Sequence, residues 1–168
     1  MEKVLVSACL LGQPVRYNGG DKRSEDQVLQ RWIREGRVVG FCPEIAGGLS
    51  VPRLPAEIVD GAGGRKVLAG LSKVIDISGA DVSAQFISGA RQALECARSN
   101  GIRLAILKER SPSCGTALIY DGTFTSTEVS ESGVTAALLR EAGIRVFSEL
   151  QLTDAQAYLA QLEVEPQA

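Results

Sequence analysis

The sequence has no histidine, no Cys-X-X-Cys spacing, no dense run of basic residues and no long hydrophobic stretch. Without histidine, every mechanism that needs an imidazole base is excluded. The longest nearly apolar segment, from Val4 to Leu11, is far shorter than the roughly 18 residues that a membrane-spanning helix requires. Because the first residues also lack the hydrophobic region and small-residue cleavage pattern of a secretion signal, we expect a cytoplasmic protein.

Charge and composition narrow the class further. The 168 residues carry a net charge of −2 at neutral pH and have a pI near 5.3, which argues against tight binding to a nucleic-acid backbone. Hydrophobic residues make up 45% and charged residues 23%, the balance of a globular protein with one buried core. Disorder, collagen and coiled coil are therefore excluded as the main architecture.

Segments with the pattern of buried strands alternate with segments of helical periodicity. Strands are predicted at residues 4–6, 38–41, 57–59, 66–68, 104–107 and 145–147, and helices from Ser24 to Gly36, over 81–100 and 131–142, and from a cap at Thr153. Residues 42–55 are too rich in glycine and proline for a regular element.

This alternation predicts a doubly wound α/β fold, in which a mainly parallel, Rossmann-like sheet carries helices on both faces. No internal repeat or linker indicates a second domain. We expect one α/β domain over residues 1–150, with residues 151–168 forming a helix and, from Glu163, a frayed tail packed on the same domain. In such folds, ligands bind beyond the carboxyl ends of the strands.

Three of the four cysteines follow predicted strands. Cys9 follows the first strand, Cys42 the second, and Cys114 lies in the loop after residues 104–107. Because these loops leave the same edge of the sheet, we expect the thiols to converge on a metal, and thiolates favour soft metals and iron–sulfur clusters. Alternatively, each cysteine fills the core as a small hydrophobic residue. Cys96, in the middle of a predicted helix, is interpreted as structural.

The number of candidate thiol ligands, three, bears on whether the metal site is structural or catalytic. A structural metal site is usually closed by four ligands, whereas a catalytic site keeps one position open for water or substrate. A cluster held by three thiolates would leave one iron free to act as a Lewis acid on a soft substrate sulfur. Zinc held by three cysteines fits the same spacing, so the sequence alone does not identify the metal.

Polar residues near the cysteines supply candidates for acid–base chemistry. Glu44 lies two residues after Cys42, and with histidine absent a carboxylate is the leading candidate for a general acid or base. Ser111 and Ser113 flank Pro112 before Cys114, where their hydroxyls could bind a substrate heteroatom. The alternatives are a solvated loop glutamate and ordinary turn chemistry.

Two glycine-rich loops are candidate ligand contacts. Asn18, Gly19 and Gly20 precede a predicted helix, and backbone amides of such a loop can approach an anion closely. The segment lacks the known phosphate and dinucleotide fingerprints, so a plain loop is an equal alternative. In the second loop, residues 47–53, Arg53 could reach an anionic or carbonyl group.

Five segments, in order, resemble a bacterial family of thiouracil desulfidases that was long described as a domain of unknown function. They are Ser-Ala-Cys-Leu-Leu-Gly at 7–12, Val-Arg-Tyr-Asn-Gly-Gly at 15–20, Cys-Pro-Glu at 42–44, Gly-Gly-Leu-Ser-Val-Pro-Arg at 47–53 and Arg-Ser-Pro-Ser-Cys-Gly at 110–115. The resemblance extends over residues 3–150.

The resemblance implies a [4Fe-4S] cluster held by Cys9, Cys42 and Cys114, with a fourth iron that binds the substrate sulfur. The implied reaction is a non-redox hydrolysis that converts thiouracil to uracil and releases hydrogen sulfide. It also implies a role for Glu44 in activating water or moving protons. A serine near the third cysteine is implicated as well, and Ser111 is preferred to Ser113.

Relatives of this family that carry a second domain act on thiolated transfer RNA. This chain is mildly acidic and shows no such extension. We therefore expect the free-standing type, acting on a small thiolated pyrimidine or nucleotide, without a membrane or transfer RNA partner. The identity of that compound, recognition of a 5′-phosphate and the oligomeric state stay open.

Two other functions remain open on the sequence. One is a non-catalytic module with zinc at the three cysteines and a nucleotide in the glycine-rich loops. The other is a thiol enzyme in which one cysteine attacks the substrate sulfur and becomes a persulfide. The absence of histidine weakens the second, because the thiolate would need activation by lysine, arginine or a helix terminus.

Overall fold

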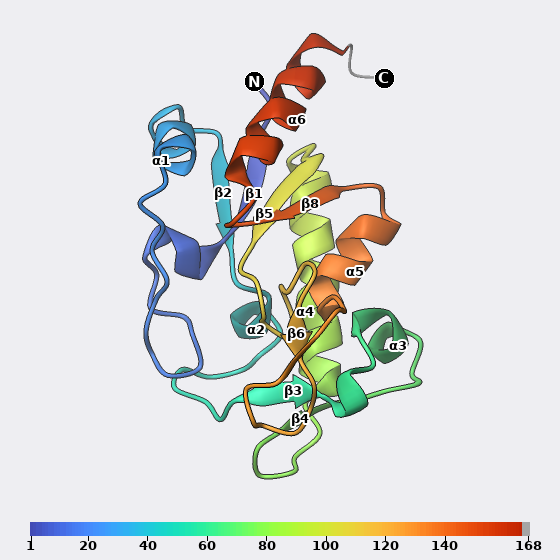
Figure 1. Ribbon diagram of the computed structural model, residues 1–168. Coiled ribbons are helices and arrows are strands. Elements are labelled where there is room, and N and C mark those ends of the chain that lie inside the picture. Colours follow the sequence, from blue (N-terminus) through green and yellow to red (C-terminus); the bar gives the residue numbers. More distant parts are fainter. Residues whose placement is uncertain (166–168) are drawn as a thin grey trace.

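A computed structural model describes residues 1–165 of the chain (Figure 1). At its centre lies a parallel sheet with the strand order β2-β1-β5-β8. Its strands are β1 (Val4–Ser7), β2 (Val38–Phe41), β5 (Leu104–Leu107) and β8 (Arg145–Ser148). Because helices cover both faces of such a sheet, the central strands β1 and β5 are buried along their whole length.

Helices pack on both faces of this sheet, which confirms the prediction of a doubly wound α/β fold. The helices on one face are α1 (Gln27–Arg34) and α6 (Leu152–Val164), and those on the other are α4 (Ser83–Ser99) and α5 (Val134–Glu141). Successive side chains of a strand point to opposite faces. Val4 and Val6 accordingly join the core under α1 and α6, while Leu5 joins the core under α4 and α5.

The remaining elements form a layer beyond the carboxyl edge of the sheet (Figure 1). They are β3 (Ala56–Ile58) paired with β4 (Val74–Asp76), β6 (Ile119–Tyr120) paired with β7 (Glu128–Val129), the short helices α2 (Pro43–Ala46) and α3 (Gly64–Leu68), and the 3-10 turns η1 (Ala8–Leu11) and η2 (Val59–Gly61). A separate core that includes Ile58, Val74, Phe86 and Ile119 holds this layer against α4 and α5.

The short helix α2 packs directly on the backbone of α4. A β-carbon at Gly89 would stand 1.9 Å from the carbonyl oxygen of Pro43, and one at Gly47 would stand 2.0 Å from that of Gln85. Only glycine fits at these two contacts. This close approach fixes the position of α2, and with it the residues that follow β2.

Three local predictions are wrong. The first helix is capped by Asp26, whose carboxylate accepts a hydrogen bond from the Val28 amide, and not by Ser24. Residues 66–68, predicted as a strand, belong to α3, because a three-residue apolar run does not distinguish a strand from a helix. Helix α2 occupies part of the segment 42–55, which was expected to be irregular.

The carboxyl-terminal helix also differs from the prediction. It begins at Leu152 without a cap at Thr153, and it continues to Val164, beyond the predicted start of the tail. The Glu163 carboxylate accepts hydrogen bonds from Arg37 at 2.8 Å and from the Glu2 amide at 3.2 Å, which ties this end to the sheet. The rest of the predicted tail, residues 166–168, lies outside the described residues.

No helix among residues 1–165 is long and apolar enough to cross a membrane.

Candidate active site

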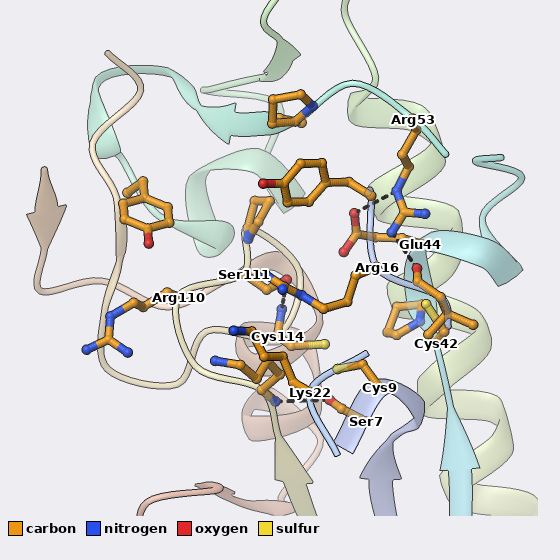
Figure 2. Close-up of a pocket in the computed structure, with 18 of the residues that line it drawn as sticks. Ser7, Cys9, Arg16, Lys22, Cys42, Glu44, Arg53, Arg110, Ser111 and Cys114 are labelled. Atoms are coloured by element: carbon orange, nitrogen blue, oxygen red, sulfur yellow. Dashed lines mark hydrogen bonds and ion pairs between the residues drawn. The ribbon is translucent and has the colours of Figure 1, made fainter. Parts of the chain in front are cut away.

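A cavity of about 520 Å³ opens at the carboxyl edge of the sheet. Its walls come from the ends of β1, β2 and β5, from the loop 15–22 and from the strand pairs β3–β4 and β6–β7. The strand order places β2 on one side of β1 and β5 on the other, so the cavity lies at the point where the winding of the sheet reverses. Cys9, Cys42 and Cys114 all line it, as Figure 2 shows, whereas Cys96 does not.

Cys9 belongs to the 3-10 turn that directly follows β1 and is only 9% exposed. Burial raises the pKa of its thiol to about 11, and the neighbouring Cys42 adds to this increase. The positive charges of Arg16 and Lys108 act in the opposite direction. The thiol is therefore close to a second thiol and to two cations.

Cys42 immediately precedes α2, which begins at Pro43. Burial raises the pKa of the Cys42 thiol, although the backbone amides of Ile45 and Glu44 donate hydrogen bonds to its sulfur. The first turn of α2 thus orients the sulfur through the backbone. The contact of α2 with α4 at Gly89 keeps this turn in place.

Cys114 is buried in the loop between β5 and β6. The Ser111 hydroxyl oxygen accepts hydrogen bonds from the amides of Ser113 and Cys114, both at 3.1 Å, and so shapes this turn. Burial raises the pKa of the Cys114 thiol, and a hydrogen bond with the Ser7 side chain only partly offsets this effect. Ser7 also accepts a hydrogen bond from the Lys108 amide at 3.0 Å, so β1 and β5 are joined beside the thiol.

The three cysteines suit a bound group that is positively charged and contains soft metal ions. Burial disfavours the thiolate at all three, and a bound cation would reverse this by pairing with the negative sulfur. Among residues 1–165, no three Cys, His, Asp or Glu side chains are arranged to hold a single metal ion. In an iron–sulfur cluster each thiolate binds a different iron, so its ligands stand farther apart around it. The donor set therefore suits a cluster with one iron that has no cysteine ligand.

Glu44, on the first turn of α2, reaches into the cavity, where its neighbours are Arg53 from the loop after α2 and Ser111 from the loop after β5 (Figure 2). Its carboxylate oxygen Oε1 is 3.3 Å from Arg53 Nε, and the Ser111 side chain hydrogen-bonds to the same carboxylate. Burial raises the pKa of Glu44 above its usual range, and the Arg53 and Ser111 contacts only partly oppose this. A carboxylate in this position can hold a water molecule and accept its proton.

Arg53 connects the two glycine-rich loops. Its guanidinium donates hydrogen bonds to the carbonyl oxygens of Ser50 at 3.1 Å and Val15 at 2.9 Å, besides contacting Glu44. Only 8% of its side chain is exposed. Arg53 thus supports Glu44, and it also lines the cavity, so its role as a substrate contact stays a prediction.

Some residues predicted at the site do not line the cavity. Ser113 is fully buried, and its hydroxyl forms a hydrogen bond of 2.8 Å with that of Thr135 in α5. Asn18, Gly19 and Gly20 form a turn beside the cavity, in which the Asn18 side chain accepts the Gly20 amide at 2.9 Å. Residues 15–17 and Lys22 of the same loop provide the wall instead.

Other residues of the cavity were not predicted from the sequence. Arg16, Arg110, Tyr17, Tyr120 and Phe124 give it cationic and aromatic walls. Tyr120 in β6 and Phe124 in the following polar turn have a weak sequence signal, because only the pairing of β6 with β7 brings them to the cavity. Arg16 and Arg110 do belong to motifs that the sequence displays, next to residues already noted.

Comparisons with known proteins give consistent results. The family model described as 2-thiouracil desulfurase matches residues 4–151. The uncharacterized protein YbbK of Bacillus subtilis (strain 168) is 46% identical over 151 residues, which cover 90% of this chain and 98% of YbbK. The solved structure of TudS, a [4Fe-4S]-dependent thiouracil desulfidase, matches with a TM-score of 0.87 at 47% identity, covering 96% of this chain and 99% of TudS. Every residue that lines the cavity falls within the matched segment.

Proposed function

The chain belongs to the 2-thiouracil desulfurase family, and on that premise we propose that it hydrolyses thiolated pyrimidines in the cytoplasm. In this reaction thiouracil and water give uracil and hydrogen sulfide. A carbon–oxygen bond replaces the carbon–sulfur bond, and both protons of the water leave with the sulfide. No electrons are transferred, so the reaction needs neither an oxidant nor a reductant.

The proposed cofactor is a [4Fe-4S] cluster held by Cys9, Cys42 and Cys114. Support comes from the dependence of the similar enzyme TudS on such a cluster and from the three thiols around one cavity. When bound, the cluster supplies a soft Lewis acid for the substrate sulfur. Since sulfur and oxygen differ little in shape, this preference for sulfur is what separates substrate from product.

Glu44 is proposed to bind the attacking water and to accept its proton. The ion pair with Arg53 Nε fixes the position of the carboxylate, and its partly buried position limits competition from bulk water. The Ser111 hydroxyl, which bonds to the same carboxylate, is proposed to carry the proton onward toward the leaving sulfide. Its oxygen is held by two backbone amides, so the direction of the hydroxyl is set by the Cys114 loop.

The cavity wall carries several cationic side chains. Among the described residues, the Lys22 ammonium group has no hydrogen bond or ion pair. The Arg16 guanidinium lies over the ring of Tyr17, 5.8 Å from its centroid, and its charge also acts on Cys9 and Glu44. These side chains favour a substrate with an anionic part. A thiolated uridine nucleotide is therefore proposed alongside the free base. The net charge of −2 argues against transfer RNA as the substrate.

The observation that carries this proposal is the convergence of three thiols with Glu44 in one cavity of a chain from this family. The test is anaerobic reconstitution with iron and sulfide, followed by an assay of sulfide and uracil released from 2-thiouracil. About four irons per chain and stoichiometric release of both products support it. Zinc in place of iron, without sulfide release, would favour the metal-binding module and contradict the desulfidase.

A further inference from the structure

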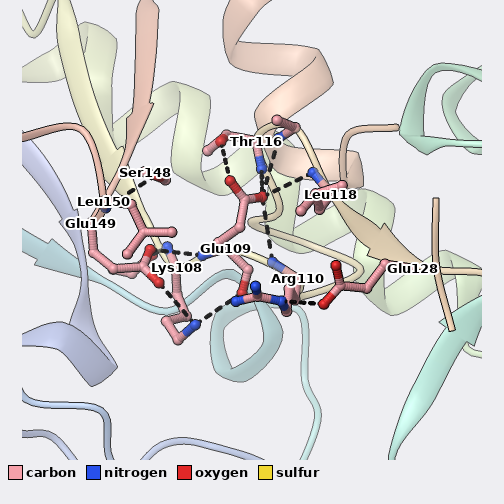
Figure 3. Close-up of polar contacts among 11 residues, drawn as sticks. Lys108, Glu109, Arg110, Thr116, Leu118, Glu128, Ser148, Glu149 and Leu150 are labelled. Carbon is pink, nitrogen blue, oxygen red and sulfur yellow. Dashed lines mark hydrogen bonds and ion pairs between the residues drawn. The ribbon is translucent and has the colours of Figure 1, made fainter. Parts of the chain in front are cut away.

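The loop that carries Cys114 is closed around a buried glutamate. Residues 108–118 leave β5, pass through Ser111 and Cys114, and return to the start of β6 (Figure 3). The two ends of the loop meet, because the Arg110 amide donates a hydrogen bond to the Leu118 carbonyl oxygen at 3.2 Å. Glu109 lies at the mouth of this closed loop and is 5% exposed.

The Glu109 carboxylate accepts hydrogen bonds from most of the free donors on the returning side of the loop. Its Oε1 atom accepts the amides of Thr116 at 2.6 Å and of Ala117 and Leu118, both at 3.1 Å. Its Oε2 atom accepts the Thr116 hydroxyl at 2.6 Å. A buried carboxylate with several charge-assisted hydrogen bonds is a rigid anchor, because moving it away would leave a buried charge without its donors.

A second carboxylate, directly after the neighbouring strand β8, anchors the outgoing side of the loop. Glu149 follows β8, and its Oε2 atom accepts the Glu109 amide at 2.9 Å, while its Oε1 atom pairs with Lys108 Nζ at 2.9 Å. Lys108 also donates to the Glu109 carbonyl oxygen at 3.0 Å. The backbone of Glu109 is thus held by the sheet, and its side chain holds Thr116, two residues after Cys114.

We propose that Glu109 is a positioning residue for the site: its carboxylate sets where the loop places the Cys114 sulfur and the Ser111 hydroxyl. The inference rests on the proposed function, because it assigns a cluster to Cys114. Glu109 lines the cavity wall, but its carboxylate oxygens are occupied by the loop, so it acts through Cys114 and Ser111 rather than on the substrate.

A second buried carboxylate of the same cavity provides a matched control. Glu57 in β3 is 9% exposed and accepts the amides of Gly122 at 2.9 Å and Phe124 at 3.2 Å. It anchors the turn between β6 and β7, which carries no cysteine. Loss of its charge should disturb a loop by the same chemistry without moving a cluster ligand.

The test compares Glu109→Gln with Glu57→Gln after anaerobic reconstitution, by the rate at which a chelator removes iron and by the electron paramagnetic resonance spectrum of the reduced cluster. We expect Glu109→Gln to release iron about tenfold faster than the wild type and to alter the spectrum. Glu57→Gln should stay within about twofold and leave the spectrum unchanged. Thr116→Val, which removes one of the donors, should give about threefold faster release.

The outcomes separate the two proposals. Unchanged release and spectrum in Glu109→Gln, or equal changes in both glutamine variants, would overturn the positioning role while leaving the proposed function in place. A wild-type protein that takes up no iron and sulfide would overturn the proposed function and this inference with it. If Glu109→Gln does not fold, the folded Thr116→Val variant decides: faster release supports the inference, and a wild-type rate overturns it.

Discussion

Glu44 and Arg53 form an ion pair in the cavity wall, with 3.3 Å between the Glu44 Oε1 atom and the Arg53 Nε atom. One belongs to the first turn of α2 and the other to the loop that follows it, so the ion pair closes residues 44–53 into a compact unit. Because Arg53 also binds the Val15 carbonyl oxygen, the pair connects this unit to the loop after β1. The proposed base is therefore held by contacts from three parts of the chain.

This relationship predicts the effect of removing the Glu44 charge. Glu44→Gln keeps the size of the side chain but cannot accept a proton from water, so we expect kcat to fall by at least about 100-fold. Iron and sulfide content should equal those of the wild type, because Glu44 is not a proposed cluster ligand. Steady-state sulfide release and metal analysis on the same preparation check both parts. Undiminished turnover would remove Glu44 from the mechanism.

The four cysteines predict a clear contrast between substitutions. Cys9→Ala, Cys42→Ala and Cys114→Ala should each prevent stable cluster binding, because each removes one thiolate from a set of three. Cys96→Ala should bind the cluster normally, since Cys96 lies in α4 and does not line the cavity. Iron content and the visible charge-transfer band after reconstitution provide the measurement. Loss of the cluster in Cys96→Ala would show that the ligand assignment is wrong.

The two serines beside Pro112 should respond in opposite ways. Ser111→Ala removes the hydroxyl that contacts Glu44, so sulfide release per bound cluster should fall about tenfold or more. Because the same hydroxyl accepts the Ser113 and Cys114 amides, cluster content should fall as well, and iron content is measured on the same preparation. Ser113→Ala removes the buried hydrogen bond to Thr135 and should lower the free energy of unfolding by about 1 kcal/mol, with turnover close to that of the wild type. Kinetics and denaturant unfolding of both variants test this pair, and equal kinetic effects would contradict it.

Glu109 predicts an acid-sensitive contribution to stability. Burial by itself raises the pKa of Glu109, but the hydrogen bonds from Thr116, Ala117 and Leu118 outweigh it, and the pKa lies below its usual value. A carboxyl group whose pKa is lower in the folded state stabilises the protein fully above its unfolded pKa, about 4.3, and loses that contribution as the pH falls through the folded value. The gap in unfolding free energy between cluster-free wild type and Glu109→Gln should therefore shrink below about pH 4.3. Urea unfolding at several pH values measures it, and a gap that widens on acidification would contradict the prediction.

At Gly89, in α4, we expect an effect of alanine that is opposite to its usual helix propensity. Alanine in an exposed helix interior usually stabilises by about 1 kcal/mol relative to glycine. At Gly89 the added β-carbon would stand 1.9 Å from the Pro43 carbonyl oxygen, so Gly89→Ala should instead destabilise the protein and displace α2 with Cys42 and Glu44. The temperature of thermal unfolding and the iron content after reconstitution should both decrease. The neighbouring Ser88→Ala, made at a position in the same helix, serves as the control.

Much of the fold could be predicted because it depends on short-range patterns. The strands at 38–41 and 104–107 have the predicted bounds, since each is a four-residue segment rich in Val, Leu or Ile that stands close to turn residues. The strands β6 and β7 could not be predicted in this way. They have two residues each, and the turn between them is held by Glu57 of β3, which is more than 60 residues away in the sequence.

The sequence by itself determined the parallel sheet and the placement of three cysteines and Glu44 after strands that end at one edge. Periodicity and strand order along the chain carry that information, because parallel strands joined by helices all end on the same side. Only the tertiary structure decided which hydroxyl reaches the cavity. Ser111 and Ser113 are equivalent in spacing, but α5 approaches the loop so closely that Thr135 takes the Ser113 hydroxyl, and this leaves Ser111 for Glu44. Contacts between residues far apart in sequence set such directions, and no local pattern records them.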